Sequence, residues 1–275
     1  MNIAVILPAA GAGRRFAGNA AQSKIEIELN GRAVFLRAAQ LFLKRPEVCQ
    51  VILAVRPDDL DAFTTRWAAQ LAFHDIKLVA GGKLERWQTV QKALEIVDPQ
   101  ATHVAVHDAA RPLTSKRLID RVFEAAETYA AVIPALPASS TLKRVEDLPK
   151  DQVKQDPLDA ILGSAGKNVG RVRRVVETID RRDVVEVQTP QVFEIGLFRS
   201  AYAKLADGSI ASDAITDDAA LIEATGQTVY VVDGEPTNLK ITHPEDATLA
   251  QALVRITEKT DAKATAKQRL FGDDE

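Results

Sequence analysis

Short runs of aliphatic and β-branched residues alternate with segments of helical periodicity along most of the chain. Strand-like runs occur at residues 3–7, 51–55, 76–79, 104–106 and 131–135. Segments with apolar residues at helical spacing lie between them, at residues 34–42, 58–72, 85–97 and 118–129. This alternation is typical of parallel strands joined by helices. We therefore predict an α/β fold with a mostly parallel sheet flanked by helices.

The last third of the chain adds further elements. Residues 228–232 and 239–242 are expected to form late strands, and residues 244–256 the last long helix, with Pro, Glu and Asp in its first turn. Another helix is expected to begin with Thr216 as its hydroxyl cap, followed by Asp217 and Asp218 as first-turn acids. Gly226 would close that helix.

Two segments break the pattern. Residues 145–175 are polar and rich in Lys, Asp and Gly, and we interpret them as part of an inserted, projecting β-arm at about residues 138–187. Residues 258–275 are rich in Lys, Asp and Ala and predict a helical extension that frays into a partly disordered tail. The expected organisation is one domain over residues 1–257, which includes the arm, and a C-terminal tail.

Composition excludes several classes of protein. Of 275 residues, 46% are hydrophobic and 27% charged, which argues against a disordered chain. The net charge of −3 leaves no cationic surplus for binding nucleic acid. No apolar run approaches the length of a membrane span, residues 1–8 are too short for a secretory core, and Cys49 alone cannot form an intrachain disulfide. These features favour a cytoplasmic protein that binds neither membrane nor nucleic acid.

Small residues follow the first predicted strand directly. Residues 8–16 read Pro-Ala-Ala-Gly-Ala-Gly-Arg-Arg-Phe, so backbone N–H groups can approach an anion closely, and the paired arginines add charge. The segment lacks the Gly-Lys-Ser/Thr of a Walker loop, and Phe16 stands where a dinucleotide fingerprint requires Gly or Ala. We interpret it as a phosphate-binding loop, with a structural turn as the alternative. Lys24 would fold back onto the same phosphates or remain a solvated surface lysine.

Further motifs follow in a fixed order. They are Gly81-Gly82 with Arg86 and Thr89, residues 106–112 (VHDAARP), residues 140–144 (STLKR), residues 189–193 (TPQVF), residues 216–219 (TDDA) and residues 238–242 (NLKIT). Together with the opening loop, this set resembles the 2-C-methyl-D-erythritol 4-phosphate cytidylyltransferases of the non-mevalonate isoprenoid pathway. The resemblance covers roughly residues 3–256.

The resemblance implies a reaction and an architecture. CTP and 2-C-methyl-D-erythritol 4-phosphate would give 4-diphosphocytidyl-2-C-methyl-D-erythritol and pyrophosphate, with Mg²⁺ as cofactor. The fold would be a Rossmann-like nucleotidyltransferase. The protein would form a homodimer, in which the arm of one subunit completes the site of its neighbour.

The resemblance also implies a CTP site. It would comprise Ala9, Ala10, Gly11, Ala12, Gly13, Arg15, Lys24, Gly82, Arg86 and Thr89. Arg15 would hold the triphosphate, Lys24 would stabilise the transition state, and Gly82, Arg86 and Thr89 would line the cytosine pocket. Two positions depart from the family pattern: Ser23-Lys24-Ile25-Glu26 replaces Pro-Lys-Gln-Tyr, and Thr89 replaces Ser.

An acceptor site follows from the same resemblance. It would comprise Asp108, Arg111, Thr141, Arg181, Thr189 and Lys240, with Arg181 and Lys240 on the acceptor phosphate. Phosphoryl-type transfer depends on positioning and on neutralising charge, so the catalytic set is predicted to be cationic: Arg15, Lys24, Arg181 and Lys240. Asp108 is a candidate ligand for Mg²⁺, which the CTP phosphates would mainly hold, and a loop-capping aspartate is the alternative.

Other functions remain as alternatives. A ribitol-5-phosphate cytidylyltransferase would share the Gly-rich loop and much of the VHDAARP region. A catalytically inactive nucleotide-binding protein would fit the insertion and the altered surroundings of Lys24. The missing fingerprint glycine argues against a dehydrogenase. His74, His103, His107 and His243 lack the spacing of a metal site and are expected to be structural.

Overall fold

The computed structural model describes residues 1–11, 23–148 and 172–271, and side chains up to residue 258. The chain divides into two compact units. Unit 1 comprises Met1–Leu136 and Val187–Glu275, and unit 2 comprises Pro137–Glu186. Within the described ranges, no helix is long and apolar enough to span a bilayer.

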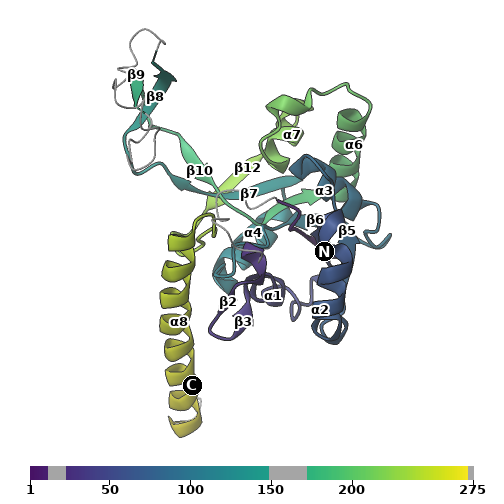
Figure 1. Cartoon of the computed structure of the whole chain (residues 1–275), viewed down its shortest axis with the longest axis vertical. Coiled ribbons are helices and arrows are strands. Elements are labelled where there is room, and N and C mark those ends of the chain that lie inside the picture. Colours follow the sequence, from purple (N-terminus) through teal and green to yellow (C-terminus); the bar gives the residue numbers. More distant parts are fainter. Residues whose placement is uncertain (12–22, 149–171, 272–275) are drawn as a thin grey trace, which may run out of the picture. The chain divides into compact units, whose positions relative to one another are not determined.

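A mostly parallel sheet forms the centre of unit 1 (Figure 1). Its strands are β1 (Ile3–Pro8), β4 (Val48–Val55), β5 (Ile76–Ala80), β6 (His103–Val106), β7 (Ala131–Pro137), β11 (Gln191–Glu194) and β12 (Tyr230–Asp233). Within unit 1 the order is β7-β11-β6-β1-β4-β5, and β12 pairs with β7. β1 lies parallel to β4 and β6, whereas β11 lies antiparallel to β6 and β7. The predicted α/β class is confirmed.

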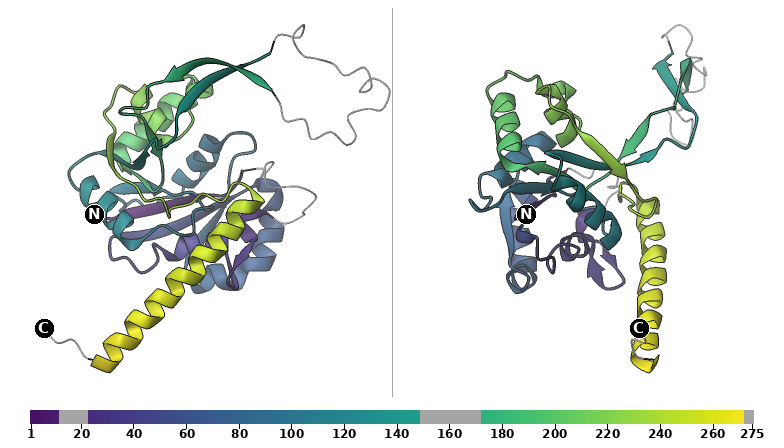
Figure 2. Two further views of the ribbon diagram at one scale, coloured as in Figure 1. Left: turned by 90° about the vertical axis from the view of Figure 1, so that its left-hand side faces the viewer. Right: turned by 180° about the vertical axis from the view of Figure 1, so that it is seen from behind.

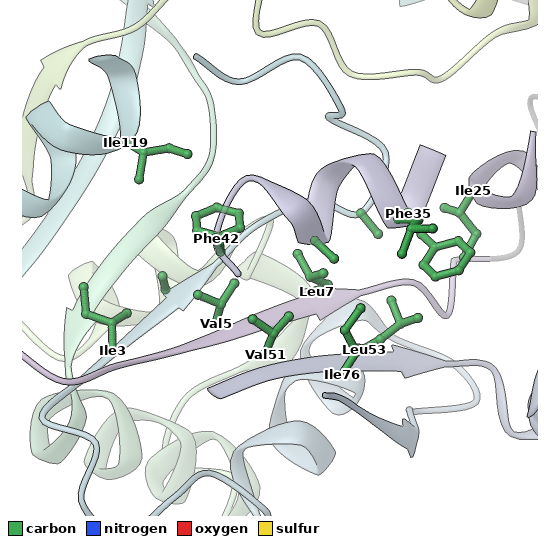
Figure 3. Packing of buried hydrophobic residues seen from close by; sticks show 14 of the residues in the cluster. Ile3, Val5, Leu7, Ile25, Phe35, Phe42, Val51, Leu53, Ile76 and Ile119 are labelled. Atoms are coloured by element: carbon green, nitrogen blue, oxygen red, sulfur yellow. The ribbon is translucent and has the colours of Figure 1, made fainter. Parts of the chain in front are cut away.

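The side chains of β1 explain how helices cover both faces of this sheet. Ile3, Val5 and Leu7 point to one face and Ala4 and Ile6 to the other, all fully buried. The first face packs against α1 (Val34–Gln40), α2 (Leu60–Phe73) and α4 (Lys116–Ala126), as Figure 3 shows in part. The second packs against α3 (Arg86–Leu94), α6 (Ile195–Ala206) and α7 (Asp218–Ala224). Burying each large aliphatic side chain contributes about 1.5–3 kcal/mol.

A hairpin and the last helix complete unit 1. The hairpin of β2 (Glu28–Leu29) and β3 (Arg32–Ala33) turns at Asn30 and Gly31, which both have positive φ. Helix α8 (Pro244–Phe271) packs on this hairpin and extends well past it (Figure 2). Ala250 and Val254 of α8 share a small buried cluster with Leu29. Helix α8 therefore includes most of the predicted tail region.

Unit 2 contains an antiparallel pair of strands, β8 (Leu142–Asp147) and β9 (Arg173–Ile179). Arg144 pairs with Glu177 across the ladder, and Arg174 pairs with Glu146. Residues 149–171, most of the polar segment recognised in the sequence, lie outside the described residues.

Two local predictions for the last third of the chain are wrong. Residues 239–242 form no strand, because Ile241 makes a single backbone bond to the carbonyl of Ala110 (2.9 Å) instead of joining a ladder. The N-cap of α7 is Asp217 rather than Thr216, since the Asp217 carboxylate accepts from the Ala220 N–H at 2.9 Å. Gly226, with φ of 79°, follows the end of α7 as predicted.

Candidate active site

A cavity of about 550 Å³ opens in unit 1 beside the loops that follow β1, β4, β5 and β6. Because these strands are parallel, their carboxyl ends meet at one edge of the sheet, where open α/β sheets bind ligands. The cavity brings together many of the predicted site residues. Those on its wall are Ala9, Ala10, Gly11, Lys24, Gly82, Arg86, Thr89, Asp108 and Lys240.

The Gly-rich loop leaves β1 at the cavity wall. The Ala9 N–H donates to the carbonyl of Ala54 at 2.7 Å, so the loop begins as a continuation of the β1–β4 ladder. Ala10 and Gly11 follow on the cavity wall. Ala12, Gly13 and Arg15, which were predicted for the CTP site, lie outside the described residues.

Glycines in the loop after β5 pack tightly against α3. A Cβ atom at Gly82 would lie 2.3 Å from Cβ of Gln88, and one at Gly81 would lie 2.7 Å from Cγ2 of Thr89. The Gly82 N–H donates to the Thr89 hydroxyl at 3.1 Å. The Gly81-Gly82 motif is therefore explained by close approach of the loop to the first turn of α3, which places Thr89 against the loop.

Asp108 is the electrostatic centre of the cavity. Its Oδ2 lies 2.9 Å from Nζ of Lys240 and 3.3 Å from Nε of Arg111, and its Oδ1 lies 3.9 Å from Nη2 of Arg86. Burial raises the pKa of this carboxyl group, but the three cations more than offset that effect and hold the pKa below its ordinary value. Asp108 is therefore ionised, and it holds Lys240 at the cavity wall.

A row of buried hydrogen bonds fixes the backbone of Asp108 on the side away from the cavity. Nε2 of His107 faces the Arg111 carbonyl at 3.0 Å, so it must donate. Nδ1 then accepts from the Thr189 hydroxyl at 3.1 Å, and that hydroxyl accepts from the Asp108 N–H at 3.1 Å. Burial is the main cause that lowers the pKa of His107, to about 4, which keeps the ring neutral.

Two predicted acceptor contacts belong to this supporting layer. Thr189 and Arg111 are buried and do not line the cavity. Nη1 of Arg111 donates to the carbonyl of Asn238 at 2.6 Å, two residues before Lys240. Thr189 and Arg111 therefore act on the cavity indirectly, because they hold Asp108 and the segment of Lys240 in position.

Lys24 lies in a short 3₁₀ helix, η1 (Lys24–Glu26). Its Nζ donates to the carbonyl of Ile241 at 3.1 Å, which brings it next to the residue that follows Lys240. Arg56 and Lys83 add to the positive charge of the wall, and Glu85 joins Asp108 in opposing it. Cations outnumber acids among the described wall residues, which suits a polyphosphate.

The sequence interpretation missed the contact of Asp218. It assigned Asp218 to the start of a helix, but the structure also pairs its buried Oδ2 with Nη1 of Arg86 at 2.6 Å. Tyr202 of α6 donates to the other carboxylate oxygen at 2.7 Å. No local pattern reveals a partner that lies 132 residues away, although a second acid after the helix cap is a weak signal.

Thr141 and Arg181 lie in unit 2. Arg181 donates to the carbonyl of Ser139, and Arg182 pairs with Asp180. Both arginines are exposed. Their predicted contacts with an acceptor remain predictions.

No metal-binding cluster of three or more His, Cys, Asp or Glu occurs among the residues the structure describes. Asp108 faces the cavity, but both of its oxygens point toward cationic side chains. A metal ion at Oδ2 would have to displace Lys240. The geometry therefore favours Asp108 as an organiser of cations over Asp108 as a metal ligand.

A mostly parallel sheet with a cationic cavity at the carboxyl ends of its strands defines a Rossmann-like nucleotidyltransferase. The model of the 2-C-methyl-D-erythritol 4-phosphate cytidylyltransferase family matches residues 3–157 and 159–256. The chain belongs to this family, which confirms the resemblance recognised in the sequence.

Named relatives agree with this assignment. The 2-C-methyl-D-erythritol 4-phosphate cytidylyltransferase of Acidobacterium capsulatum is 36% identical, over 93% of this chain and 98% of its own. The one from Rhodopirellula baltica is 37% identical, over 92% and 95%. Among solved structures, the 4-diphosphocytidyl-2C-methyl-D-erythritol synthase of Anaerococcus prevotii is similar with a TM-score of 0.69, at 28% identity over 92% of this chain and 96% of its own. The Thermus thermophilus enzyme is similar with a TM-score of 0.63, at 29% identity over 93% and 100%.

Proposed function

We propose that this protein transfers the cytidylyl group of CTP to 2-C-methyl-D-erythritol 4-phosphate, with release of pyrophosphate. One observation carries the proposal: Lys24, Arg86 and Lys240, distant in sequence, line one cavity beside the loop after β1. Family membership over nearly the whole chain supplies the identities of the nucleotide and the acceptor.

The reaction is a displacement at phosphorus. An oxygen of the acceptor phosphate attacks the α-phosphorus of CTP and forms a new P–O bond. The bond from the α-phosphorus to the bridging oxygen breaks, and pyrophosphate leaves with the electron pair. Since a phosphate monoester is largely ionised near neutral pH, the attack needs no general base. Asp108 is well suited to this chemistry, because a carboxylate held by three cations is a weak base and a good anchor.

The residues divide between the two substrates. We assign Ala9, Ala10, Gly11, Gly82, Arg86 and Thr89 to CTP, and Lys240 with Asp108 to the acceptor. Lys24 lies next to the segment that carries Lys240, so its charge would act on the α-phosphate between the two substrates. By the sequence motifs, we further assign Ala12, Gly13 and Arg15 to the triphosphate, and Thr141 and Arg181 to the acceptor.

Mg²⁺ is the proposed cofactor. It would be held mainly by the phosphates of CTP, since Mg²⁺ prefers phosphate oxygens and water with few protein carboxylates. When bound there, it would neutralise charge on the triphosphate. The residues of this chain would position the complex around it, with Lys24 and Lys240 supplying the remaining positive charge.

A homodimer and a cytoplasmic location complete the proposal. Val175 and Val176 on β9 are more than half exposed, which supports the use of unit 2 in association with a second copy. The single cysteine favours a reducing compartment.

Pyrophosphate release is the direct test. The purified protein is incubated with Mg²⁺, each of the four ribonucleoside triphosphates, and either 2-C-methyl-D-erythritol 4-phosphate or ribitol 5-phosphate. We expect release with CTP and the methylerythritol phosphate, and its loss when EDTA removes the metal. Faster turnover with ribitol 5-phosphate would overturn the choice of acceptor, and CTP binding without release would overturn the assignment as an enzyme.

A further inference from the structure

The Thr-Asp-Asp-Ala motif at residues 216–219 has no part in the mechanism above, yet it contacts the cavity wall through Arg86. We propose that Asp218 and Tyr202 are positioning residues that hold Arg86 in place for CTP before the nucleotide binds. This inference rests on the proposed function and deepens it, because it names residues outside the cavity that set its affinity for CTP.

The contacts form a chain from the core to the cavity. The Tyr202 hydroxyl donates to Oδ1 of Asp218 at 2.7 Å, and Nη1 of Arg86 donates to Oδ2 at 2.6 Å. Tyr202 and Asp218 are buried, with 3% and 1% of their surfaces exposed, whereas the Arg86 side chain is 32% exposed. The buried pair is thus the fixed end of the chain and Arg86 is the end that reaches the cavity.

The protonation states support the same arrangement. Burial is the main cause that raises the pKa of Tyr202 well above its ordinary value, and Asp218 adds to the effect, so the hydroxyl remains a donor. Burial opposes the charge of Arg86, but Asp218 and Asp108 more than offset it and raise its pKa. Tyr202 and Arg86 therefore both remain hydrogen-bond donors over the neutral pH range.

Gln191 of the Thr-Pro-Gln-Val-Phe motif fixes the position of Asp218. Its Nε2 donates to Oδ2 of Asp217 at 2.7 Å, and its Oε1 accepts from the Ala219 N–H at 3.1 Å. These two bonds bracket Asp218 and attach the start of α7 to β11. Gln191 and the start of α7 are therefore parts of one structure that ends at Arg86.

Holding Arg86 in advance matters because an arginine side chain has many rotamers. A ligand that must order such a side chain loses affinity, whereas a side chain already held by a fixed carboxylate does not impose that cost. Asp218 also balances the charge of Arg86, so that Arg86 contributes oriented N–H donors rather than net charge. Donors of this kind distinguish a nucleobase by the positions of its acceptors.

Binding of CTP in the presence of Mg²⁺, measured by calorimetry, tests the proposal without requiring turnover. We expect Asp218→Asn to weaken CTP binding about tenfold, a change of about 1.4 kcal/mol. Tyr202→Phe removes only a hydroxyl group and should weaken binding about threefold, which keeps the test available should Asp218→Asn fold poorly. Turnover at saturating CTP should fall by less than either change in affinity.

A double-variant comparison separates positioning of Arg86 from general damage. In an Arg86→Ala background, Asp218→Asn should cause no further loss of CTP affinity. Asp120→Asn is the matched control, because it breaks the Arg45–Asp120 pair, which does not line the cavity, and should leave affinity unchanged. Unchanged affinity in both Asp218→Asn and Tyr202→Phe would overturn the inference, as would an equal loss with and without Arg86.

A protein that binds CTP as expected but releases no pyrophosphate would contradict the proposed enzyme and leave this inference intact. Conversely, normal turnover with CTP affinity insensitive to Asp218 would overturn the inference and leave the proposed function intact. The two proposals can therefore fail separately.

Discussion

Asp108 keeps its charge in a place where burial alone would favour the neutral acid. Lys240, Arg86 and Arg111 approach it from three separate segments of the chain, and together they outweigh the cost of burial. The consequence for function is geometric. A lysine paired with a fixed carboxylate presents its ammonium group at a defined point of the cavity, where an incoming phosphate can share it.

His107 provides a test of the layer that supports Asp108. The folded protein holds the pKa of His107 at about 4, against an ordinary value of 6.5. As pH falls from 6.5 toward 4, the unfolded chain takes up a proton that the folded chain refuses, so the free energy of unfolding decreases. Each pKa unit is worth about 1.4 kcal/mol, so the full loss is about 3 kcal/mol.

Urea unfolding at a series of pH values in that interval, for the wild type and His107→Gln, measures this contribution. We expect the wild type to lose stability relative to the variant as pH falls. Burial also lowers the pKa of His103, which acts in the same direction in both proteins, so the difference between them is the relevant quantity. Parallel stability curves for the two proteins would contradict the assignment of a neutral, buried imidazole.

The short helix η1 shows how an element can aim one side chain. A 3₁₀ helix has three residues per turn, so its three side chains point about 120° apart. Ile25 enters the core, Glu26 accepts from Nη1 of Arg66 (2.5 Å) and Nε1 of Trp67 (2.9 Å) on α2, and Lys24 faces the cavity. With the other two directions anchored, the direction of Lys24 is set.

Substitution of Glu26 should therefore affect catalysis through Lys24. Glu26→Gln weakens a charge-assisted contact with α2, and we expect kcat to fall about tenfold with little change in KM for CTP. In a Lys24→Ala background the same substitution should have no further effect. Asp75→Asn, which breaks an exposed pair with Lys77, is the control. Equal losses in both backgrounds would mean that Glu26 stabilises the fold without aiming Lys24.

The elements differ in how far the sequence could predict them. The strand β1 and the helix α2 follow from local apolar patterns, and both were predicted to within about two residues. Residues 239–242 were wrongly predicted as a strand because their apolar alternation reflects burial of Ile241 against Ala110 and α8, not pairing in a sheet. Helix α6 was missed, and the antiparallel direction of β11 depends on neighbours that local patterns do not show.

The cavity itself was predictable only through motif order. Lys24 comes close to Lys240 because its Nζ donates to the carbonyl of Ile241, 217 residues further along the chain. No rule of local sequence spacing predicts such a contact. The resemblance to a known family supplied it, and it supplied Asp108 in the same way. The role of Asp218 was missed because its partner Arg86 lies in another motif, 132 residues away.

At the scale of the whole molecule, the C-terminal helix supports the site. Ala250 and Val254 of α8 pack with Ile241 and Ala110. Ile241 follows Lys240 in the chain, and Ala110 comes two residues after Asp108. Gln251 accepts from the Asn30 N–H at 2.9 Å, and Glu258 pairs with Arg37 at 2.9 Å. The first part of α8 therefore holds the loop of Lys240 against the hairpin of β2 and β3, close to the segment that carries Lys24.

This arrangement predicts that two truncations of α8 will differ sharply. A chain that ends at residue 260 keeps every contact named above, and the family match ends at residue 256, so its melting temperature and turnover should equal those of the full chain. A chain that ends at residue 248 loses Ala250 and Val254 from the buried cluster and should lose about 3 kcal/mol or more of stability. Its turnover at a temperature where it remains folded should also fall, because Lys240 loses its support.

Thermal unfolding and pyrophosphate release of the three proteins measure both effects. An equal loss of activity in the two truncated chains would contradict this prediction. It would mean that the turns of α8 after residue 260 also help to position Lys240.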